Sequence, residues 1–327
     1  MKAIVYTKNR SPDVLQLKEV DKPIPKENEA LVKVHATSLN AADFENLGKS
    51  MYKTLGSDIA GRVEAVGVNV KQFLPDDEIW GDLSAHGFGT FVEYVCVPEK
   101  ALRLKPASMT FEEAAAIPTA GVVALQNLRG AEPSFPNIFL SDKGQIQPGQ
   151  QVLINGAGGG VGTFAVQIAK YFGAEVTGVD STGKLDMLRS IGADQVIDYT
   201  QEDFTKNGQL YDLILDVVVQ RSVFDYRRAM SPKGICVFIG GSMARVFFNL
   251  FLGLLISMTG SKKIGLVMWR PNKKEDLDFL QELFEAGKVV PVIDRSYSLS
   301  EVPEALRYLE EGHVRGKVVI TVEQNSK

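Results

Sequence analysis

A glycine-rich segment in the middle of the chain constrains its fold more than any other feature. The segment Asn155 to Gly162 follows an apolar run that starts at Gln151, and it opens an amphipathic stretch that ends near Phe172. Read from Ala157, it matches the A-x-G-x-x-G turn that binds dinucleotides, in which Gly159 admits a pyrophosphate and Gly162 lets a helix press on the strand. The alternative is a glycine-rich turn that serves packing alone. We expect a cofactor to bind through Ala157, Gly158, Gly159, Gly160, Val161 and Gly162.

Strands and helices are predicted to alternate after this segment. Apolar strands are expected at residues 151–155, 175–179, 195–197, 213–219 and 235–239, with helical stretches between them. Such alternation is typical of a parallel, doubly wound α/β sheet. The first hundred residues instead hold short β-branched runs separated by turns, and a last strand is expected at Lys317 to Val322. We therefore expect a Rossmann-type domain, residues 118–288, inserted into a β-rich domain formed by residues 1–117 and 289–327.

The residues after the second predicted strand give conflicting signals about the cofactor. Asp180 lies 18 residues beyond Gly162, where an acid usually binds the ribose 2′-hydroxyl of NAD and would repel the 2′-phosphate of NADP. Ser181 and Lys184 follow at once, and Tyr199 comes after the third strand, so hydroxyl donors and a cation are available for a 2′-phosphate. An ordinary surface role for Lys184, and an ordinary strand-end role for Tyr199, remain alternatives.

Composition excludes several classes of protein. Among the 327 residues, 36 Lys and Arg stand against 40 Asp and Glu, so no basic excess is available to neutralise the phosphates of a nucleic acid. The two cysteines cannot form a disulfide framework or a four-thiolate zinc site. The chain has no H-E-x-x-H, G-x-S-x-G or Walker lysine motif, and no Tyr followed four residues later by Lys. Because the first residues include no long apolar segment, a cytoplasmic location is expected.

One apolar run raises the question of a membrane. The run Val246 to Met258 has 13 residues, with Asn249 and Gly253 inside it, whereas a spanning helix needs about 20 apolar residues. Its length favours a buried helix or one that faces a partner, such as a dimer contact, or one that walls a pocket. Peripheral membrane contact is the less favoured alternative.

Six short motifs carry a resemblance to a known family. They are Ser38 to Asp43, Leu55 to Gly61, Asp77 to Gly81, Ile117 to Gly121, Ile191 to Asp194 continued to Asp198-Tyr199, and Arg315 to Ile320. With the glycine loop, they resemble the medium-chain dehydrogenase/reductase superfamily over essentially the whole chain. The resemblance is to its zinc-independent quinone oxidoreductase and alkenal reductase branch. It implies a GroES-like fold for the β-rich catalytic domain, and a homodimer.

The resemblance also implies a reaction. Zinc-dependent members carry a catalytic Cys where this chain has Asn40, and Gly-His-Glu where it has Gly56-Ser57-Asp58. The expected enzyme therefore has no metal site, and it uses NADPH to transfer hydride to a quinone or to the C=C bond of an α,β-unsaturated carbonyl. NADH is the alternative cofactor because of Asp180. Alternative functions are a zinc-free alcohol dehydrogenase or ketoreductase, or a weakly catalytic NADPH-binding protein.

Catalytic and substrate roles follow from the same resemblance. Asn40 and Asp43 are expected at the floor of the active site, although Asn40 could also N-cap a helix with Asp43 completing the capping box. Tyr52 is a candidate to orient or protonate the substrate carbonyl. His86 and Trp269 are candidates for the substrate pocket, with a surface position for His86 and ordinary core packing for Trp269 as the alternatives.

Further residues are expected to bind the cofactor. The resemblance places Thr119 against the nicotinamide, and it places Gly240 and Gly241 where the backbone approaches that ring closely. It assigns the 2′-phosphate to Lys184 and Tyr199, and it adds Lys317 to the cofactor-binding residues. No role is assigned to the segment 131–147.

Overall fold

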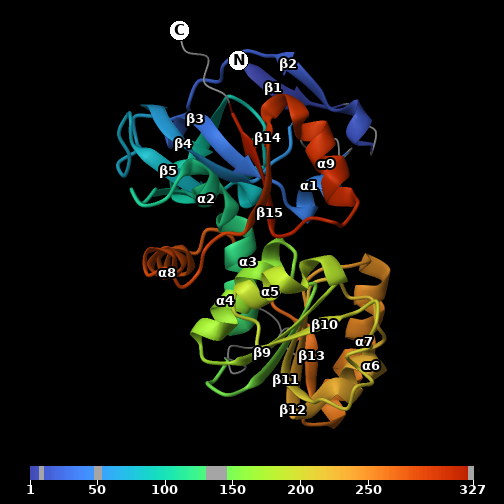
Figure 1. Ribbon diagram of the computed structural model, residues 1–327. Helices are drawn as coiled ribbons and strands as arrows, with labels where there is room; N and C mark the ends of the chain where they lie inside the picture. Colours follow the sequence, from blue (N-terminus) through green and yellow to red (C-terminus); the bar gives the residue numbers. More distant parts are fainter. Residues whose placement is uncertain (7–10, 48–53, 130–145, 323–327) are drawn as a thin grey trace. The chain divides into compact units, whose positions relative to one another are not determined.

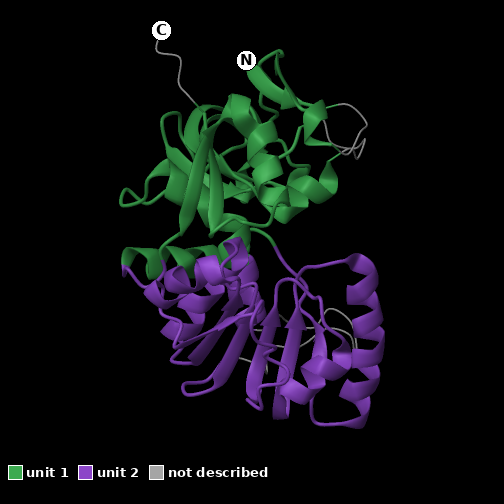
Figure 2. Ribbon diagram, turned by 45° about the vertical axis from the view of Figure 1, so that its right-hand side comes forward, with its two compact units in different colours: residues 1–122, 271–285, 290–327 green, residues 123–270, 286–289 purple. Residues whose placement is uncertain are grey.

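The structure, a computed structural model, describes residues 1–6, 11–47, 54–129 and 146–322. The chain forms two compact units (Figure 2). Unit 1 comprises Met1–Val122, Pro271–Glu285 and Val290–Lys327, and unit 2 comprises Val123–Arg270 and Ala286–Val289. Unit 2 thus interrupts unit 1 in the sequence. The domain limits expected at 117/118 and 288/289 stay a prediction, because compactness alone does not test them.

Unit 2 contains a six-stranded parallel sheet in the order β10-β9-β8-β11-β12-β13. Its strands are β8 (Gln151–Asn155), β9 (Glu175–Asp180), β10 (Gln195–Asp198), β11 (Tyr211–Asp216), β12 (Met230–Phe238) and β13 (Lys263–Leu266). Helices α4 (Gly160–Tyr171) and α5 (Leu185–Ser190) cover one face, and α6 (Val223–Ala229) and α7 (Met243–Thr259) cover the other (Figure 1). This arrangement confirms the expected doubly wound α/β fold, with β13 as a strand that the sequence pattern did not indicate.

Unit 1 is built around a sheet with the strand order β14-β15-β3-β4-β5-β7, in which β6 also pairs with β3. Among the described strands of this sheet, β14 and β15 are parallel and the other pairs are antiparallel. The strands are β3 (Glu29–Ser38), β4 (Asp58–Val66), β5 (Glu78–Asp82), β6 (Tyr94–Pro98), β7 (Leu102–Leu104), β14 (Ile293–Ser298) and β15 (Lys317–Thr321), and β1 (Lys2–Val5) pairs separately with β2 (Gln16–Glu19). The β-rich GroES-like expectation is therefore confirmed.

Helices of unit 1 lie against this sheet or beside it. They are α1 (Ala41–Asn46), α2 (Phe111–Ala116), α8 (Lys274–Glu285) and α9 (Val302–Glu310). Helix α2 begins with a complete capping box, in which Thr110 and Glu113 satisfy each other's backbone N–H groups. Helix α3 (Pro118–Arg129) belongs to unit 1 at its start and to unit 2 from Val123 onward. The start of α3 and the ends of β3, β4 and β5 carry the polar residues described below.

Helix α7 is buried on one side only. Val246, Asn249, Leu250 and Gly253 are the buried residues among its 17. Of the alternatives that the sequence left open, a fully buried helix is therefore excluded, and the alternatives with an outward face stay predictions. Among the described residues, no helix is both long enough and apolar enough to cross a membrane.

Candidate active site

The glycine loop of unit 2 joins β8 to α4, as the sequence predicts. Gly162 is required by packing, because a Cβ there would lie 2.2 Å from the carbonyl oxygen of Gly156. Gly159 is different: its φ of −88° suits any residue, and a Cβ there would meet nothing closer than 3.6 Å. The space beside Gly159 is therefore free for a ligand. The first N–H groups of α4 have no intrahelical partner and no side-chain cap, which suits an anion such as a pyrophosphate.

Asp180 and Lys184 form a buried ion pair beside this loop. One carboxylate oxygen of Asp180 accepts from the N–H of Gly158 at 2.8 Å, and the other accepts from the N–H of Ser181 at 2.8 Å. Lys184 Nζ lies 3.4 Å from Asp180 Oδ1, and both side chains are at most 10% exposed. The carboxylate is thus bound and balanced by the protein's own groups. A Cβ at Gly158 would lie 2.6 Å from the Lys184 side chain, so this lysine packs directly on the loop.

Tyr199 lies close to the same strand end. The N–H of Tyr199 donates to the carbonyl oxygen of Asp180 at 3.2 Å, and Tyr199 is 54% exposed. The Ser181 hydroxyl lies 3.5 Å from Asp180 Oδ1. The structure therefore gathers Ser181, Lys184 and Tyr199 around the end of β9, as the sequence predicts.

Gly240 and Gly241 follow β12 and lie against the loop after β11. A Cβ at Gly240 would be 2.6 Å from the Val217 carbonyl oxygen, and one at Gly241 would be 2.5 Å from the Val218 carbonyl oxygen. Packing within unit 2 alone therefore accounts for both glycines, and their nicotinamide role stays a prediction. Val219, in the facing loop, has φ = +34°, which is rare for a β-branched residue.

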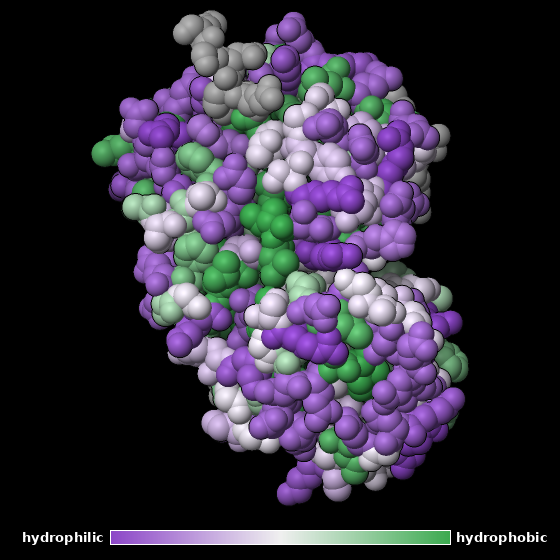
Figure 3. Space-filling view, in the orientation of Figure 1, coloured by the Kyte–Doolittle hydropathy of each residue, from purple (hydrophilic) through white to green (hydrophobic). Residues whose placement is uncertain are grey.

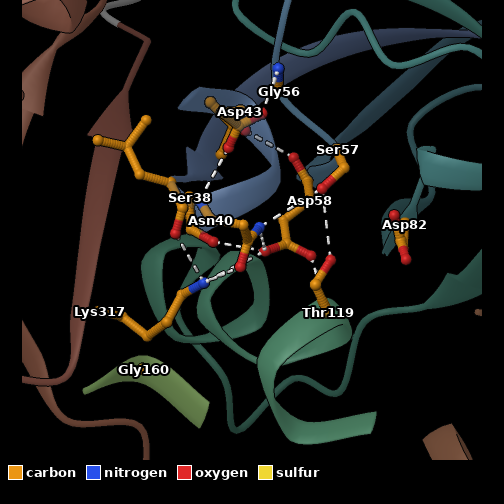
Figure 4. A network of polar contacts seen from close by, with 12 residues as sticks. Ser38, Asn40, Asp43, Gly56, Ser57, Asp58, Asp82, Thr119, Gly160 and Lys317 are labelled. Atoms are coloured by element: carbon orange, nitrogen blue, oxygen red, sulfur yellow. Dashed lines mark hydrogen bonds and ion pairs between the residues drawn. The ribbon is translucent and has the colours of Figure 1, made fainter. Parts of the chain in front are cut away.

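Unit 1 holds a buried polar cluster centred on Asp58 (Figure 4). Asp58 is fully buried at the start of β4, and its Oδ2 accepts from Ser38 Oγ at 2.6 Å and from Asn40 Nδ2 at 2.8 Å. Its Oδ1 accepts from the N–H of Thr119 at 2.8 Å. One carboxylate thus ties together the end of β3, the start of α1 and the start of α3.

Lys317 supplies the positive charge of this cluster. Its ammonium donates to Asn40 Oδ1 at 2.7 Å and to the Leu39 carbonyl oxygen at 3.0 Å, and it lies 3.5 Å from Asp58 Oδ2. The residue is only 2% exposed, and burial lowers the pKa of its ammonium while the Asp58 carboxylate opposes that change. This position favours a role as internal counter-ion. The cofactor role expected for Lys317 stays a prediction.

Asn40 is the N-cap residue of α1 and forms a capping box with Asp43, so this alternative from the sequence is confirmed. The N–H of Asn40 donates to Asp43 Oδ2 at 2.8 Å, and the N–H of Gly56 donates to Asp43 Oδ1 at 2.9 Å. The Asp43 carboxylate therefore stabilises the N-terminus of α1 and the turn before β4. This carboxylate serves local structure, whereas the Asn40 amide also donates to Asp58 of the cluster.

Ser57 and Thr119 place two hydroxyl groups next to Asn40. The two oxygens are 3.3 Å apart, and Asn40 Nδ2 lies 3.4 Å from Ser57 Oγ. Thr119 is 9% exposed and begins α3, as the sequence predicts. These groups form a short line of donors and acceptors that can exchange protons.

Two buried carboxyl groups complete the cluster. Burial raises the pKa of Asp43 to about 7, although the hydrogen bonds from the backbone N–H groups of Asn40 and Gly56 lower it. Burial also raises the pKa of Asp82 to about 7, helped by the charge of Asp58 and opposed by Ser84 and Thr119. Asp82 ends β5, where its oxygens accept from the N–H of Ser84 at 2.7 Å and from its hydroxyl at 2.9 Å. Both acids therefore hold protons in a range where most carboxyl groups are ionised.

The variant Asp82→Asn is expected to remove part of the pH dependence of stability. The unfolded chain loses this proton near the ordinary value of 3.8, whereas the folded chain keeps it until about pH 7. The free energy of unfolding therefore falls as pH rises between these values, and each pKa unit corresponds to about 1.4 kcal/mol. Asparagine is neutral in both states, and its side-chain oxygen can accept from the N–H of Ser84 while its NH2 group donates to the Ser84 hydroxyl, so the variant should melt about 2 °C or more above the wild type at pH 8.

Thermal unfolding at pH 4 and pH 8 checks this prediction. At pH 4 the variant and the wild type should melt together, because Asp82 is largely protonated in the folded wild type. The control is Asp186→Asn, since the Asp186 side chain is fully exposed. An equal difference between Asp82→Asn and the wild type at both pH values would contradict the prediction.

The donor atoms of the cluster do not fit a catalytic zinc ion. Such sites use thiolate, imidazole and carboxylate ligands, whereas Asn40 and Ser57 offer only an amide and a hydroxyl. The Lys317 ammonium also already contacts the oxygens of Asn40 and Asp58. Within the described ranges, no group of three or more His, Cys, Asp and Glu side chains could hold a metal ion.

Three other predicted residues have no described hydrogen bond to this cluster, or fall outside the described residues. Tyr52 falls outside the described residues, as does most of the segment 131–147. His86 lies in a short 3-10 turn of unit 1, and burial together with the charge of Lys100 lowers its pKa. Trp269 lies in unit 2 after β13, and its buried Nε1 has no hydrogen-bond partner among the described residues. Their substrate-pocket roles stay predictions.

Sequence reasoning missed the residues that hold the cluster together. The sequence marks Asp58 and Ser57 only as replacements for zinc ligands, and it does not single out Asp82. A signal was present, since Asp58 and Asp82 both lie at strand ends within or directly after the family motifs. Nothing in the local sequence indicates that they converge with Lys317.

Comparisons with known proteins agree with this fold and site. The family model described as "Alcohol dehydrogenase GroES-like domain" matches residues 26–107. The model described as "Zinc-binding dehydrogenase" matches residues 191–320. The chain is 36% identical to 2-methylene-furan-3-one reductase of Solanum lycopersicum, over 98% of this chain and 79% of that protein. It is 32% identical to the chloroplastic NADPH-dependent alkenal/one oxidoreductase of Arabidopsis thaliana, with the same coverage.

A solved structure gives the same result. The quinone oxidoreductase from Coxiella burnetii superposes with a TM-score of 0.87 at 29% identity, covering 99% of both chains. Fold, motifs and relatives therefore agree over the whole length. The chain belongs to the medium-chain dehydrogenase/reductase superfamily, as an NAD(P)H-dependent oxidoreductase of its quinone oxidoreductase and alkenal reductase branch.

Proposed function

We propose that this protein is an NADPH-dependent, zinc-independent reductase of quinones or of the C=C bond of α,β-unsaturated carbonyls. The observation that carries the proposal is the Lys317 ammonium, which binds Asn40 Oδ1 at 2.7 Å and lies 3.5 Å from Asp58 Oδ2. The Lys317 ammonium thus contacts the oxygen atoms of Asn40 and Asp58 that a metal ion would need as ligands. Conjugated acceptors suit such a site, because conjugation already activates them towards hydride. The Solanum relative is named as a 2-methylene-furan-3-one reductase and the Arabidopsis relative as an alkenal/one oxidoreductase, which supports this substrate class.

The Asp180–Lys184 pair supports NADPH over NADH. An unpaired carboxylate at this position would bind the ribose 2′-hydroxyl of NADH and repel a 2′-phosphate. Here both oxygens of Asp180 accept backbone N–H groups, and Lys184 balances the charge. Lys184 and the exposed Tyr199 then favour a phosphate at the same strand end. The Arabidopsis relative is named as NADPH-dependent, which agrees with this choice.

The residues of each unit have separate tasks in this proposal. When bound, NADPH supplies the hydride, and the free space beside Gly159 with the start of α4 holds its pyrophosphate. Asn40, Ser57 and Thr119 orient the acceptor through hydrogen bonds. Addition of hydride leaves an anion that must take up one proton. The buried Asp82 carboxyl stores such a proton, and the neighbouring Thr119 and Ser57 hydroxyls can pass it on.

The variant Lys184→Met is expected to raise the KM for NADPH about tenfold or more, because the cation that attracts the 2′-phosphate is lost. The KM for NADH should change much less. Steady-state kinetics with both cofactors at one acceptor concentration measure the effect. The matched control is Lys170→Met, since Lys170 forms an ion pair with Asp194 elsewhere in unit 2. If Lys184→Met weakens both cofactors equally, Lys184 has only a structural role.

Anaerobic oxidation of NADPH and NADH with four acceptors tests the proposed function. A quinone, an enal, an enone and a saturated ketone are compared, and the zinc content of the same sample is measured. Turnover of the quinone or the activated alkene with NADPH, without stoichiometric zinc, supports the proposal. Preferred reduction of the saturated ketone would point to a ketoreductase. Cofactor binding without turnover of any acceptor would point to a weakly catalytic NADPH-binding protein.

A homodimer in the cytoplasm completes the proposal. Among the described strands, β13 pairs only with β12, and its other edge supports self-association because an open strand edge offers N–H and C=O groups. Light scattering after size exclusion tests the dimer, and cell fractionation tests the location.

A further inference from the structure

Helix α7 presents a wholly apolar face to solvent. Six large apolar side chains on it are each at least 50% exposed, namely Met243, Phe247, Phe248, Phe251, Leu255 and Met258. At 3.6 residues per turn they fall within an arc of about 140°. The other residues of this arc, Ala244 and Leu254, are also apolar. By contrast, hydrophilic residues dominate the face of the molecule seen in Figure 3, where hydrophobic residues gather in small groups.

The opposite side of α7 is fixed against unit 2 by small and polar residues. Asn249 is 1% exposed, and its side chain accepts from the N–H of Val223 at 3.0 Å and donates to the Arg221 carbonyl oxygen at 2.9 Å. A Cβ at Gly253 would lie 2.8 Å from the Ile264 side chain. Because these contacts depend on an amide and a glycine, α7 cannot rotate its apolar face inward without losing them. The exposed face is therefore a fixed property of the fold.

Basic residues flank this helix in the sequence of unit 2. Residues 226–270 include seven Lys and Arg but no Asp or Glu, although the whole chain has a net charge of −4. Arg228 pairs with Asp225, just before this segment. Arg245 lies in the first turn of α7, and Lys262 and Lys263 follow its end. Lys263 Nζ bonds to the Ser257 carbonyl oxygen at 2.6 Å, and Lys262 Nζ bonds to that of Arg227 at 2.7 Å. Positive charge thus gathers at both ends of the apolar face.

We propose that α7 docks this protein on an anionic lipid surface. The helix lies in the plane of the membrane, its phenylalanine, leucine and methionine side chains enter the boundary between headgroups and acyl chains, and the flanking lysines and arginines bind the lipid phosphates. A second copy of the chain fits this face less well. A two-fold contact would bring the same basic residues together from both sides, with no acid in the segment to pair with them.

This proposal goes beyond the proposed reductase activity and does not depend on it. Binding uses only the outer face of α7 and its basic flanks, which share no residue with the glycine loop or the Asp58 cluster. A failure of one proposal therefore leaves the other standing. If both hold, the enzyme works where lipid-soluble quinones and lipid-derived alkenals are concentrated.

Vesicle flotation with the full chain tests the docking surface. Vesicles of phosphatidylcholine are compared with vesicles of equal parts phosphatidylcholine and phosphatidylglycerol. We expect the wild type to float only with the anionic vesicles, and salt should reduce the bound fraction. The double variant Phe247→Ser with Phe251→Ser should bind at least about tenfold more weakly, and Lys262→Gln with Lys263→Gln should also bind more weakly.

Control variants distinguish docking through α7 from a general effect of exposed apolar side chains. Ile24→Ser with Val68→Ser changes two apolar residues of unit 1 that are 87% and 86% exposed, and it should bind vesicles like the wild type. The variant Phe251→Trp should show a blue shift of tryptophan emission with anionic vesicles only. Failure of the wild type to bind anionic vesicles overturns the proposal, and so does unchanged binding by the Phe247/Phe251 variant. Conversion of a dimer into a monomer by that variant, without any vesicle binding, would assign the face to a second copy.

Discussion

Replacing Lys317 by methionine is expected to lower the free energy of unfolding by about 3–5 kcal/mol. The ammonium is 2% exposed and is the cation that lies within 3.5 Å of Asp58 Oδ2. Its removal leaves a fully buried carboxylate without a counter-ion, and it also leaves the Leu39 carbonyl oxygen and Asn40 Oδ1 without their shared donor. Asn40 should then turn, so kcat with a quinone or enone should fall at least about tenfold in the fraction that folds.

A double variant makes this prediction specific. Asp58→Asn with Lys317→Met removes both charges, so it should recover more than half of the lost stability, measured by denaturant unfolding. The KM for NADPH separates the two roles of Lys317: it should stay near the wild-type value if Lys317 is a counter-ion, and it should rise if Lys317 binds the cofactor. Lys105→Met is the matched control, because Lys105 is also buried but pairs with the partly exposed Glu78. An equal loss in both single variants would contradict the assignment.

Two glycine-to-alanine variants of the cofactor loop are expected to have different defects. One should lose stability, and the other should lose affinity for NADPH. Gly162→Ala forces a Cβ to within 2.2 Å of the Gly156 carbonyl oxygen and 2.6 Å of Ala157, both of them backbone contacts. The loop or the helix must shift, so the protein should lose about 1–3 kcal/mol of stability. Gly159→Ala meets nothing closer than 3.6 Å and should melt with the wild type. Its methyl group would instead occupy the space for the pyrophosphate, and NADPH affinity should fall about 10- to 100-fold.

Isothermal titration with NADPH and thermal unfolding, both applied to each variant, measure this contrast. Gly260→Ala serves as the control, since its Cβ would lie 3.4 Å from the nearest atom, at the end of α7 and away from the loop. It should change neither property. Full NADPH affinity in Gly159→Ala would show that no ligand approaches this residue.

The fold of this protein follows from its sequence to a large extent. The glycine loop, the strands β8, β9 and β11 and the helix α4 were all predicted, because apolar periodicity and the small-residue turn are local signals. The strands β13 and β14 were not predicted. Both contain charged residues that interrupt an apolar pattern, and they pair with β12 and β15 at the ends of the two sheets, which local sequence does not reveal.

The candidate site was predicted only in part, for a physical reason. Asn40, Asp43 and Thr119 were found because motifs mark them, and the structure brings Asn40 and Thr119 together around Asp58. The central role of Asp58 could not be found, because it depends on partners from β3, α3 and β15. Likewise, Asp180 and Lys184 gave conflicting signals as separate residues, and their ion pair could not be read from the sequence. For α7 the sequence left a buried and an outward-facing helix open, because apolar composition alone does not tell which side of a helix is covered.

The pairing of Asp58 with Lys317 also constrains when unit 1 can finish folding during synthesis. The two residues are separated by 259 positions, and the whole of unit 2 lies between them in the sequence. A ribosome therefore releases β3 and β4, with Asp58 still lacking its cation, long before it releases β15. Unit 2 is nearly continuous from Val123 to Arg270 and can fold in that interval. The first segment of unit 1, Met1–Val122, therefore lacks β15 and the Lys317 ammonium until synthesis is nearly complete, and during that interval chaperones and proteases have access to the incomplete unit.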